Sequence, residues 1–354
     1  MEKKNKKSIF KVIFNIVIAL IIVLIFAFLC LSENGLADLW KNIQDFKVKW
    51  ILAGVACQFA NLFIDYYLTY RFVKHYHKDY KLWKAVKTTA IGQFFSAVTP
   101  GASGGQPMQV YTLTTQGVSS GIATSALMQK FVVYQVVLTL YSAVTLLLRF
   151  DYFRGTLGAI MKNLALIGFL VQATIIGILL LFSFNRKVTK KLIVFVFNLL
   201  AKIHLIKKPE EKIINLENQL EIFHKSNKDL YKDKTLLLES YVVTAIQLTS
   251  MFLIPYCVYR SFGFYGASAI DMICSESFTM MVSYFTPLPG ASGASEGASY
   301  VFFSSLFSPE TIKSAILIKR LLSYYLIILL TAPFSYISKK KRAEEVHETK
   351  EQNL

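Results

Sequence analysis

GQFFSAVTPGASGG at residues 92–105 and MVSYFTPLPGASGAS at residues 281–295 each end an apolar arm in the same pentapeptide, PGASG. The two copies begin at Pro100 and Pro289, 189 residues apart. Proline removes a backbone donor and glycine permits irregular dihedral angles, so each pentapeptide is expected to break a helix. Inside a bilayer, irregular backbone survives only where protein covers it or where it lines a watery cavity. We therefore expect the two loops to line one shared site inside a membrane.

The composition supports a membrane protein. Hydrophobic residues make up 54% of the 354 residues and aromatic residues 14%, whereas charged residues make up only 17%, against about 25% in an average soluble protein. Several apolar stretches of about 20 residues are long enough to cross a hydrocarbon core of about 30 Å. The sequence predicts an all-α polytopic membrane protein that forms a single integral membrane domain over residues 1–354.

Six apolar segments are predicted to cross the membrane completely. They are residues 12–31, 51–70, 122–148, 164–184, 236–259 and 312–337. Two further apolar arms, residues 85–98 and 269–286, lead directly into the PGASG loops. The first arm is only 14 residues long, which is too short to span and favours a re-entrant hairpin. The second arm is ambiguous by length alone.

The distribution of Lys and Arg resolves this ambiguity. Of the 39 Lys and Arg residues, 28 lie in the N-terminal segment, in residues 71–87 and 186–234, and in the C-terminal tail. Cytoplasmic loops carry such an excess, so we predict six transmembrane helices, both termini in the cytoplasm, and two re-entrant hairpins that enter from opposite faces. The net charge of +17 therefore does not indicate nucleic-acid binding. We expect a multi-pass protein of the bacterial cytoplasmic membrane.

This topology predicts an inverted repeat. Unit one covers about residues 51–148 and unit two about residues 236–337, with a cytoplasmic amphipathic loop at 185–235 between them and a basic tail at 338–354. Paired interrupted segments in two inverted halves are typical of a transporter site near the midplane. The alternative to a transporter site is that the PGASG loops only break two helices for close packing. The alternative to an amphipathic loop at 185–235 is a polar linker between the two units.

The candidate binding residues are those of the loops and the charged residues at membrane depth, because ionisable groups there are costly and usually functional. We predict that a lipid headgroup contacts Pro100, Gly101, Ser103, Gly104, Gln106, Lys130, Pro289, Gly290, Ser292, Gly293, Glu296, Lys319 and Arg320. The lipid tails are expected to remain in the bilayer. The alternatives to headgroup binding are that Glu296 is a carboxylate near the outer membrane interface and that the Lys319 and Arg320 side chains snorkel to the outer surface. Glu276 lies on the second arm, and Asp65 is expected to pair with Arg71 or Lys130.

Enzyme signatures are missing from the sequence. It holds no GxxxxGK[ST], no HExxH and no CxxC, and its five histidines fall in segments predicted to be loops or tail. We predict no catalytic residue, no metal site and no cofactor, and we interpret the four cysteines as packing thiols.

Three motifs together resemble one known family. GQFFSAVTPGASGGQPMQVYTL (92–113), FTPLPGASGASEGASYVFF (285–303) and IKRLLSYYLIILL (318–330) resemble the transmembrane region of bacterial lysylphosphatidylglycerol synthases. The resemblance covers about residues 50–337, although Gln106 stands where a carboxylate is common in the family. It implies a flippase-like protein and, for this chain, a stand-alone member without the aminoacyltransferase domain.

The resemblance implies movement of aminoacylated phosphatidylglycerol, such as lysylphosphatidylglycerol, between leaflets, and thus resistance to cationic antimicrobial peptides. It also implies membrane phospholipid and a separate soluble aminoacyltransferase as partners, while the oligomeric state stays open. The alternatives are a phosphatidylglycerol lysyltransferase role by family membership, which this chain alone is not expected to catalyse, and a carrier of polyprenyl-linked lipid. A membrane scaffold without transport is a third alternative.

Overall fold

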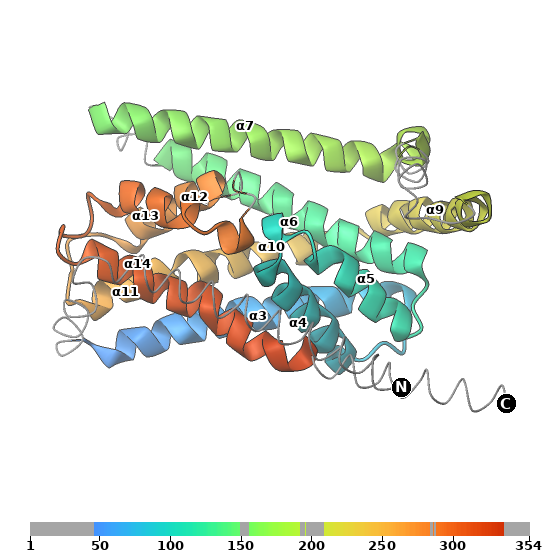
Figure 1. Cartoon of the computed structure of the whole chain (residues 1–354), viewed down its shortest axis with the longest axis horizontal. Helices are drawn as coiled ribbons and strands as arrows, with labels where there is room; N and C mark the ends of the chain where they lie inside the picture. The colour runs from blue at the N-terminus through green and yellow to red at the C-terminus, as the bar shows by residue number, and fades with distance from the viewer. Residues whose placement is uncertain are drawn as a thin grey trace, which may run out of the picture.

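The computed structural model describes residues 46–148, 156–191, 195, 209–283, 286 and 288–335, and these form helices and turns without any strand. In chain order the helices are α3 (Val48–Tyr76), α4 (Leu82–Val98), η1 (Pro100–Ala102), α5 (Gly105–Thr115), α6 (Ser120–Leu148), α7 (Thr156–Phe184), α9 (Pro209–Lys232), α10 (Lys234–Phe252), α11 (Ile254–Ser261), α12 (Ala269–Ser283), η3 (Pro289–Ala291), α13 (Ala294–Phe303), α14 (Ile312–Arg320) and η4 (Leu321–Tyr325). Figure 1 shows the long helices α3, α6, α7 and α10 running along roughly one direction of the molecule.

The described residues contain five helical segments that are long and apolar enough to cross a membrane: Val48–Tyr76, Ser120–Leu148, Leu166–Ser183, Lys234–Ser261 and Ile312–Ser335. Each overlaps one of the predicted crossings, and the chain is a multi-pass α-helical membrane protein. The remaining predicted crossing, residues 12–31, lies outside the described residues, as does the tail at 338–354.

Two boundaries differ from the sequence prediction. The helix α3 continues to Tyr76, so residues 71–76, including His75, are helical and do not form a loop. The predicted crossing at 236–259 is two helices, α10 and α11, separated at Leu253. Pro255 lies in the first turn of α11, where a missing backbone donor is tolerated.

Two helical hairpins lie in opposite halves of the bundle. The pair α4–α5 lies in the half near α9, and the pair α12–α13 lies in the other half (Figure 1). Helices within each pair pack on one another, and the turns η1 and η3 that connect them are in contact. The two pentapeptide loops, far apart in sequence, are therefore in contact with each other.

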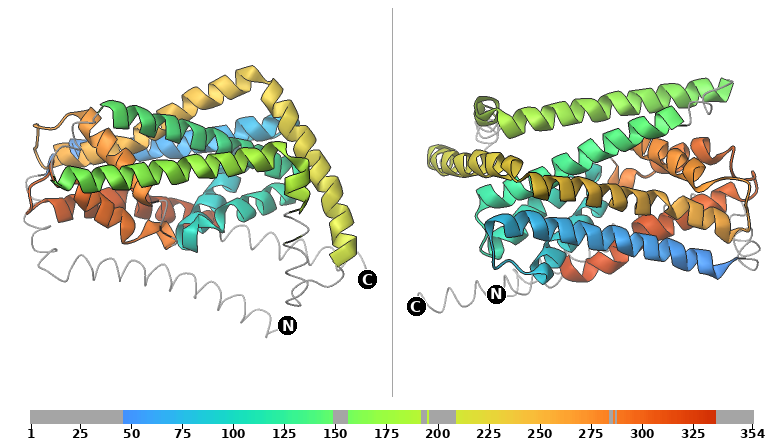
Figure 2. Two further views of the ribbon diagram at one scale, coloured as in Figure 1. Left: turned by 90° about the horizontal axis from the view of Figure 1, so that it is seen from above. Right: turned by 180° about the vertical axis from the view of Figure 1, so that it is seen from behind.

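The helix α9 occupies much of the predicted amphipathic loop at 185–235. It crosses one end of the bundle (Figure 2) and packs on α6. Its apolar side chains Leu220, Phe223 and Leu230 are buried, and the side-chain amide of Asn227 donates to the backbone carbonyl of Ser183 at 2.8 Å. Residues 209–232 of the predicted loop therefore form a helix that packs on the bundle, and this part is not only a polar linker.

Gly121 is expected to control the docking of α9 on α6. A Cβ at this position would lie 2.7 Å from the carbonyl oxygen of Gln219 and 2.9 Å from Ile222, whereas a Cβ at Gly177 in α7 would meet nothing within 4 Å. We predict that Gly121→Ala destabilises the protein by about 1–3 kcal/mol because the contact is overpacked. Gly177→Ala should stabilise α7 by up to about 1 kcal/mol. Thermal unfolding in detergent measures both, and a stabilised Gly121→Ala protein would contradict this packing.

Candidate functional site

The two Pro-Gly-Ala turns share one unusual backbone conformation. Gly101 and Gly290 have φ values of +58° and +60°, and the following Ala102 and Ala291 have φ values of +54° and +51°. An L-residue in this left-handed region costs about 1–2 kcal/mol. Such strained positions persist only where the surrounding structure enforces them, and they cluster at functional sites.

The two loops are closed in different ways after these turns. In the first, the backbone N–H of Gly104 donates to the hydroxyl of Thr99 at 2.9 Å. In the second, Gly293 has a φ of +87°, and its N–H donates to the carboxylate of Glu296 at 2.6 Å. A carboxylate in the first turn of α13 is favoured by the helix dipole. Only the second loop therefore carries a charged group bound to its own backbone.

Arg320 joins this carboxylate to the second turn. Its Nε lies 2.7 Å from Oε1 of Glu296, and its Nη2 donates to the carbonyl of Gly290 at 2.9 Å. The Arg320 side chain is 7% exposed, and its guanidinium lies 4.5 Å from the centre of the Tyr324 ring. Arg320 thus binds a carboxylate and a loop carbonyl at the same place, so its charge is compensated inside the protein.

A π-helical turn, Leu321–Tyr325, follows Arg320 directly, and such turns are frequent at functional sites. It directs Tyr324 toward both loops: the hydroxyl donates to the carbonyl of Ala97 at 2.8 Å, near the end of α4. A Cβ on Gly290 would overlap the Tyr324 ring. Position 290 therefore needs glycine for its dihedral angle and for the close approach of the ring.

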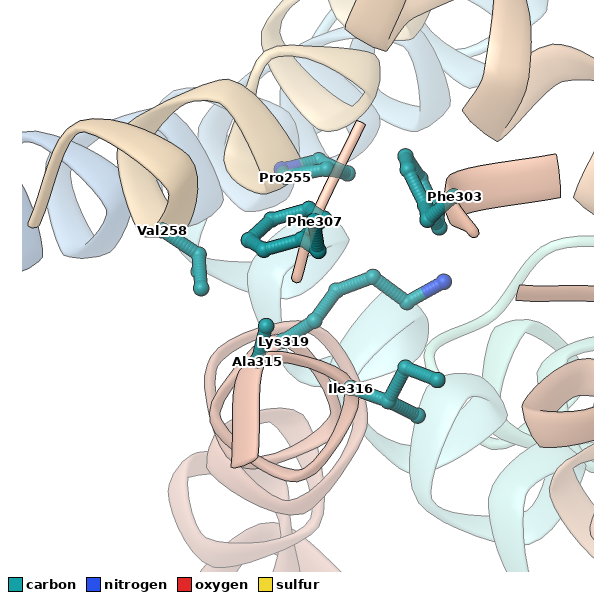
Figure 3. A pocket seen from close by; sticks show the side chains of 7 residues that line it. All are labelled: Pro255, Val258, Phe303, Phe307, Ala315, Ile316 and Lys319. Carbon is teal, nitrogen blue, oxygen red and sulfur yellow. The ribbon is translucent and has the colours of Figure 1, made fainter. Parts of the chain in front are cut away.

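Lys319 forms a second buried ion pair beside the first. Its Nζ lies 2.7 Å from Oε2 of Glu276 on α12 and 2.7 Å from the hydroxyl of Ser299 on α13. Figure 3 shows the aliphatic stem of Lys319 beside Phe307 and Ile316, in a small cleft that Pro255, Val258, Phe303 and Ala315 also line. Lys319 and Arg320 are 3% and 6% exposed, so neither snorkels to the outer surface.

Lys130 belongs to a third ion pair, between α3, α4 and α6. Its Nζ lies 2.6 Å from Asp65 and 2.7 Å from the hydroxyl of Thr69. The side-chain amide of Gln93 donates to the other oxygen of Asp65 at 2.8 Å. Of the two partners expected for Asp65, the structure selects Lys130, because Arg71 pairs with Glu239.

The other predicted residues lie in or next to the loops. Pro100, Gly101, Ser103 and Gln106 are exposed, and the hydroxyl of Ser292 donates to the carbonyl of Pro289 at 2.8 Å. Among the described residues, no group of three His, Cys, Asp or Glu side chains is placed to hold a metal ion.

Three residues of these ion pairs and their contacts, Asp65, Glu276 and Tyr324, were not among the predicted headgroup contacts. Glu276 lies with Asp271 on an apolar arm, and the cost of a carboxylate on such an arm was a usable signal for a cationic partner. Tyr324 had no comparable signal, because its position depends on the π-turn and on the bundle around it.

Comparison with known families gives one match. A family model for the lysylphosphatidylglycerol synthase TM region matches residues 13–331. A search of curated proteins finds none that matches. The matched family points to a role in the synthesis or translocation of lysylphosphatidylglycerol.

Removal of Arg320 should cost far more than removal of a surface arginine. We expect Arg320→Met to lower the free energy of unfolding by about 3–5 kcal/mol, because Glu296 is left as an unpaired buried charge. The double variant Arg320→Met/Glu296→Gln should recover part of this loss. Arg186→Met is the matched control, because its pair with Glu221 is 57% and 66% exposed and is worth about 1 kcal/mol or less. Chemical denaturation measures the free energy of unfolding of both variants. Equal losses for Arg320→Met and Arg186→Met would contradict a stabilising ion pair between Arg320 and Glu296.

The two turn glycines should respond differently to a methyl group. Gly101→Ala meets no atom within 4 Å and should lose only the conformational term, about 1–2 kcal/mol. Gly290→Ala adds an overlap with Tyr324, which should cost a further 1–3 kcal/mol or so. Thermal unfolding measures the stability of both variants. A smaller loss of stability for Gly290→Ala than for Gly101→Ala would contradict the close contact between Gly290 and Tyr324.

Proposed function

The chain belongs to the lysylphosphatidylglycerol synthase TM region family, and from this premise we propose that it binds a phospholipid headgroup beside the PGASG loops and moves the lipid between the leaflets of the bacterial cytoplasmic membrane. The proposed lipid is aminoacylated phosphatidylglycerol, such as lysylphosphatidylglycerol. The observation that carries the proposal is the set of three partly or fully buried ion pairs in the bundle, of which Glu296–Arg320 contacts the second PGASG loop.

These pairs are electrically balanced. Asp65 pairs with Lys130, Glu276 with Lys319 and Glu296 with Arg320, so the formal charge of the set is zero. A purely anionic headgroup that bound Arg320 would displace Glu296 and leave a buried carboxylate without a partner. An uncompensated buried charge costs about 3–5 kcal/mol. The site therefore disfavours phosphatidylglycerol itself unless a proton accompanies it.

A headgroup with both charges avoids this cost by exchanging partners. Its phosphate binds the guanidinium of Arg320, which suits planar bidentate contact. Its ammonium group takes the carboxylate that the phosphate releases, which is that of Glu296. Lysylphosphatidylglycerol carries one phosphate and two lysyl ammonium groups. The phosphate and one ammonium group exchange partners with Arg320 and Glu296, and the second ammonium group shares the carboxylate of Glu276 with Lys319, so no carboxylate is left unpaired. Lys130 and the loop residues Ser103, Gln106 and Ser292 supply further contacts along the path.

The inverted repeat supplies the movement in this proposal. Units 51–148 and 236–337 each place a hairpin between two long helices, and the matching dihedral angles at Gly101 and Gly290 support their equivalence. With six crossings, the hairpins enter from opposite faces and meet at the midplane. Rocking of one unit against the other then gives alternating access around a fixed site.

The physiological consequence follows from the charge of the lipid. Lysylphosphatidylglycerol in the outer leaflet lowers the negative surface charge, which weakens attraction of cationic peptides to the membrane. Synthesis of the lipid from aminoacyl-tRNA is assigned to a soluble aminoacyltransferase partner, and the chain contributes translocation.

A leaflet assay in reconstituted vesicles tests this function. We expect the wild-type protein to move fluorescent lysylphosphatidylglycerol and to move phosphatidylglycerol more slowly. Glu296→Gln and Lys319→Met should each slow lysylphosphatidylglycerol by tenfold or so, because loss of about 1.4 kcal/mol of binding corresponds to that factor. Arg186→Met is the surface control and should move the lipid at the wild-type rate.

Cells separate translocation from synthesis. If deletion leaves the total lysylphosphatidylglycerol unchanged and reduces only its outer-leaflet share, translocation is supported. A fall in the total amount would favour a role in synthesis. An unchanged outer-leaflet share would remove this lipid as the substrate, and the lipid that co-purifies with wild type but not with Glu296→Gln would identify the replacement.

A further inference from the structure

An apolar groove with a volume of about 600 Å³ lies between α6, α10 and α12. It is separate from the cleft at Lys319 and is lined by Val137, Leu140, Tyr141, Val144, Thr145 and Leu148 of α6, by Tyr241, Val242 and Ala245 of α10, and by Ile270, Ile273 and Cys274 of α12. Nothing in the proposed headgroup exchange uses these side chains.

The groove presents almost no polar surface, because its hydroxyl groups bond elsewhere. The hydroxyl of Tyr141 lies 3.3 Å from that of Thr249, and the hydroxyl of Thr145 donates to the carbonyl of Ser142 at 2.9 Å. With the hydroxyl groups of Tyr141 and Thr145 bonded inside the protein, the mostly aliphatic lining suits a hydrocarbon.

The groove opens sideways on two membrane spans. The lining residues of α6 and α10 lie within Ser120–Leu148 and Lys234–Ser261, both long and apolar enough to cross a bilayer. Leu140, Val144 and Val242 on its rim are 61%, 53% and 53% exposed, whereas Val137 and Cys274 on its floor are 6% and 1% exposed. The occupant therefore enters from the hydrocarbon layer.

Its size fits an acyl chain better than a protein helix. A methylene group takes up roughly the space of a water molecule, about 30 Å³, so the groove has room for a chain of the order of 20 methylenes. A helix about 10 Å wide fills roughly 400 Å³ per turn, so the same space accepts fewer than two turns. The groove therefore encloses an acyl chain but not a transmembrane helix.

We propose that this groove binds one acyl chain of the lipid whose headgroup is handled at the ion pairs. The inference rests on the proposed function, and it departs from the expectation that both tails stay in the bilayer. The two sites border the same helix, α12. Ile273 lines the groove and lies about one helical turn before Glu276, which pairs with Lys319, and the hydroxyl of Ser277 lies 3.3 Å from that of Thr145. An ammonium at Glu276 and a tail in the groove are therefore compatible with a single lipid.

The groove acts by orienting the lipid, with little gain in hydrophobic energy. A tail that leaves the bilayer exchanges one apolar surrounding for another, as helices do when they associate in lipid. Shape and length of the chain then decide the fit, so the site selects among lipids with the same headgroup by their tails.

Photocross-linking tests the groove directly. Full-length protein is reconstituted in vesicles with lysylphosphatidylglycerol that carries a mid-chain diazirine, and the labelled peptides are mapped by mass spectrometry. We expect labels concentrated at residues 137–148, 241–245 and 270–274, above the level at the exposed Leu329. Ala245→Phe on one wall and the exposed-rim variant Val144→Phe should each abolish this excess.

Ile246→Phe is the matched control, because Ile246 neighbours Ala245, is 55% exposed and does not line the groove. Labels spread evenly over the lipid-facing surface would overturn the inference. So would an excess of groove labelling that survives both groove variants. Protein-to-protein cross-links that place a protein segment in the groove would also overturn it. Cross-linking needs no transport, so groove labelling without lipid movement would refute the proposed function alone. Movement with even labelling would refute the groove alone.

Discussion

The contact of Arg320 with Glu296 and with the carbonyl of Gly290 is the interaction on which the site depends. A carbonyl freed by a Pro-Gly turn and two opposite charges would each be costly in hydrocarbon. Here each compensates another, since the guanidinium pairs with the carboxylate of Glu296 at 2.7 Å and donates to the carbonyl of Gly290 at 2.9 Å. An irregular, half-buried turn therefore persists where these groups meet.

This constraint also ties together parts of the chain that are distant in sequence. Tyr324, one turn beyond Arg320, reaches the carbonyl of Ala97 near the end of α4, and the turns η1 and η3 touch each other. The π-helical turn at Leu321–Tyr325 presents Arg320 and Tyr324 to different partners. A ligand that displaced Glu296 from Arg320 would thus act on the contact between both hairpins.

In the proposed function, charge balance and apolar shape divide the recognition of a lipid between two surfaces. The neutral set of ion pairs favours a headgroup that carries both charges, because exchange leaves no carboxylate or cation unpaired. The groove between α6, α10 and α12 offers shape without polar contacts. Because Cys274 and Glu276 lie two residues apart on α12, movement of this helix would affect head and tail together.

The sequence by itself determined the class of protein, the positions of five described helical segments and the two loops. Apolar runs and Pro-Gly breaks are local properties, and hydrocarbon enforces them strictly. It also singled out Glu296, Lys319 and Arg320, because charge at depth is rare. Only the tertiary structure decided the partners: Glu276 for Lys319 and Asp65 for Lys130. The partners in an ion pair depend on which helix faces meet, and hydropathy does not determine those faces. Hydropathy also does not determine the π-helical turn that places Tyr324.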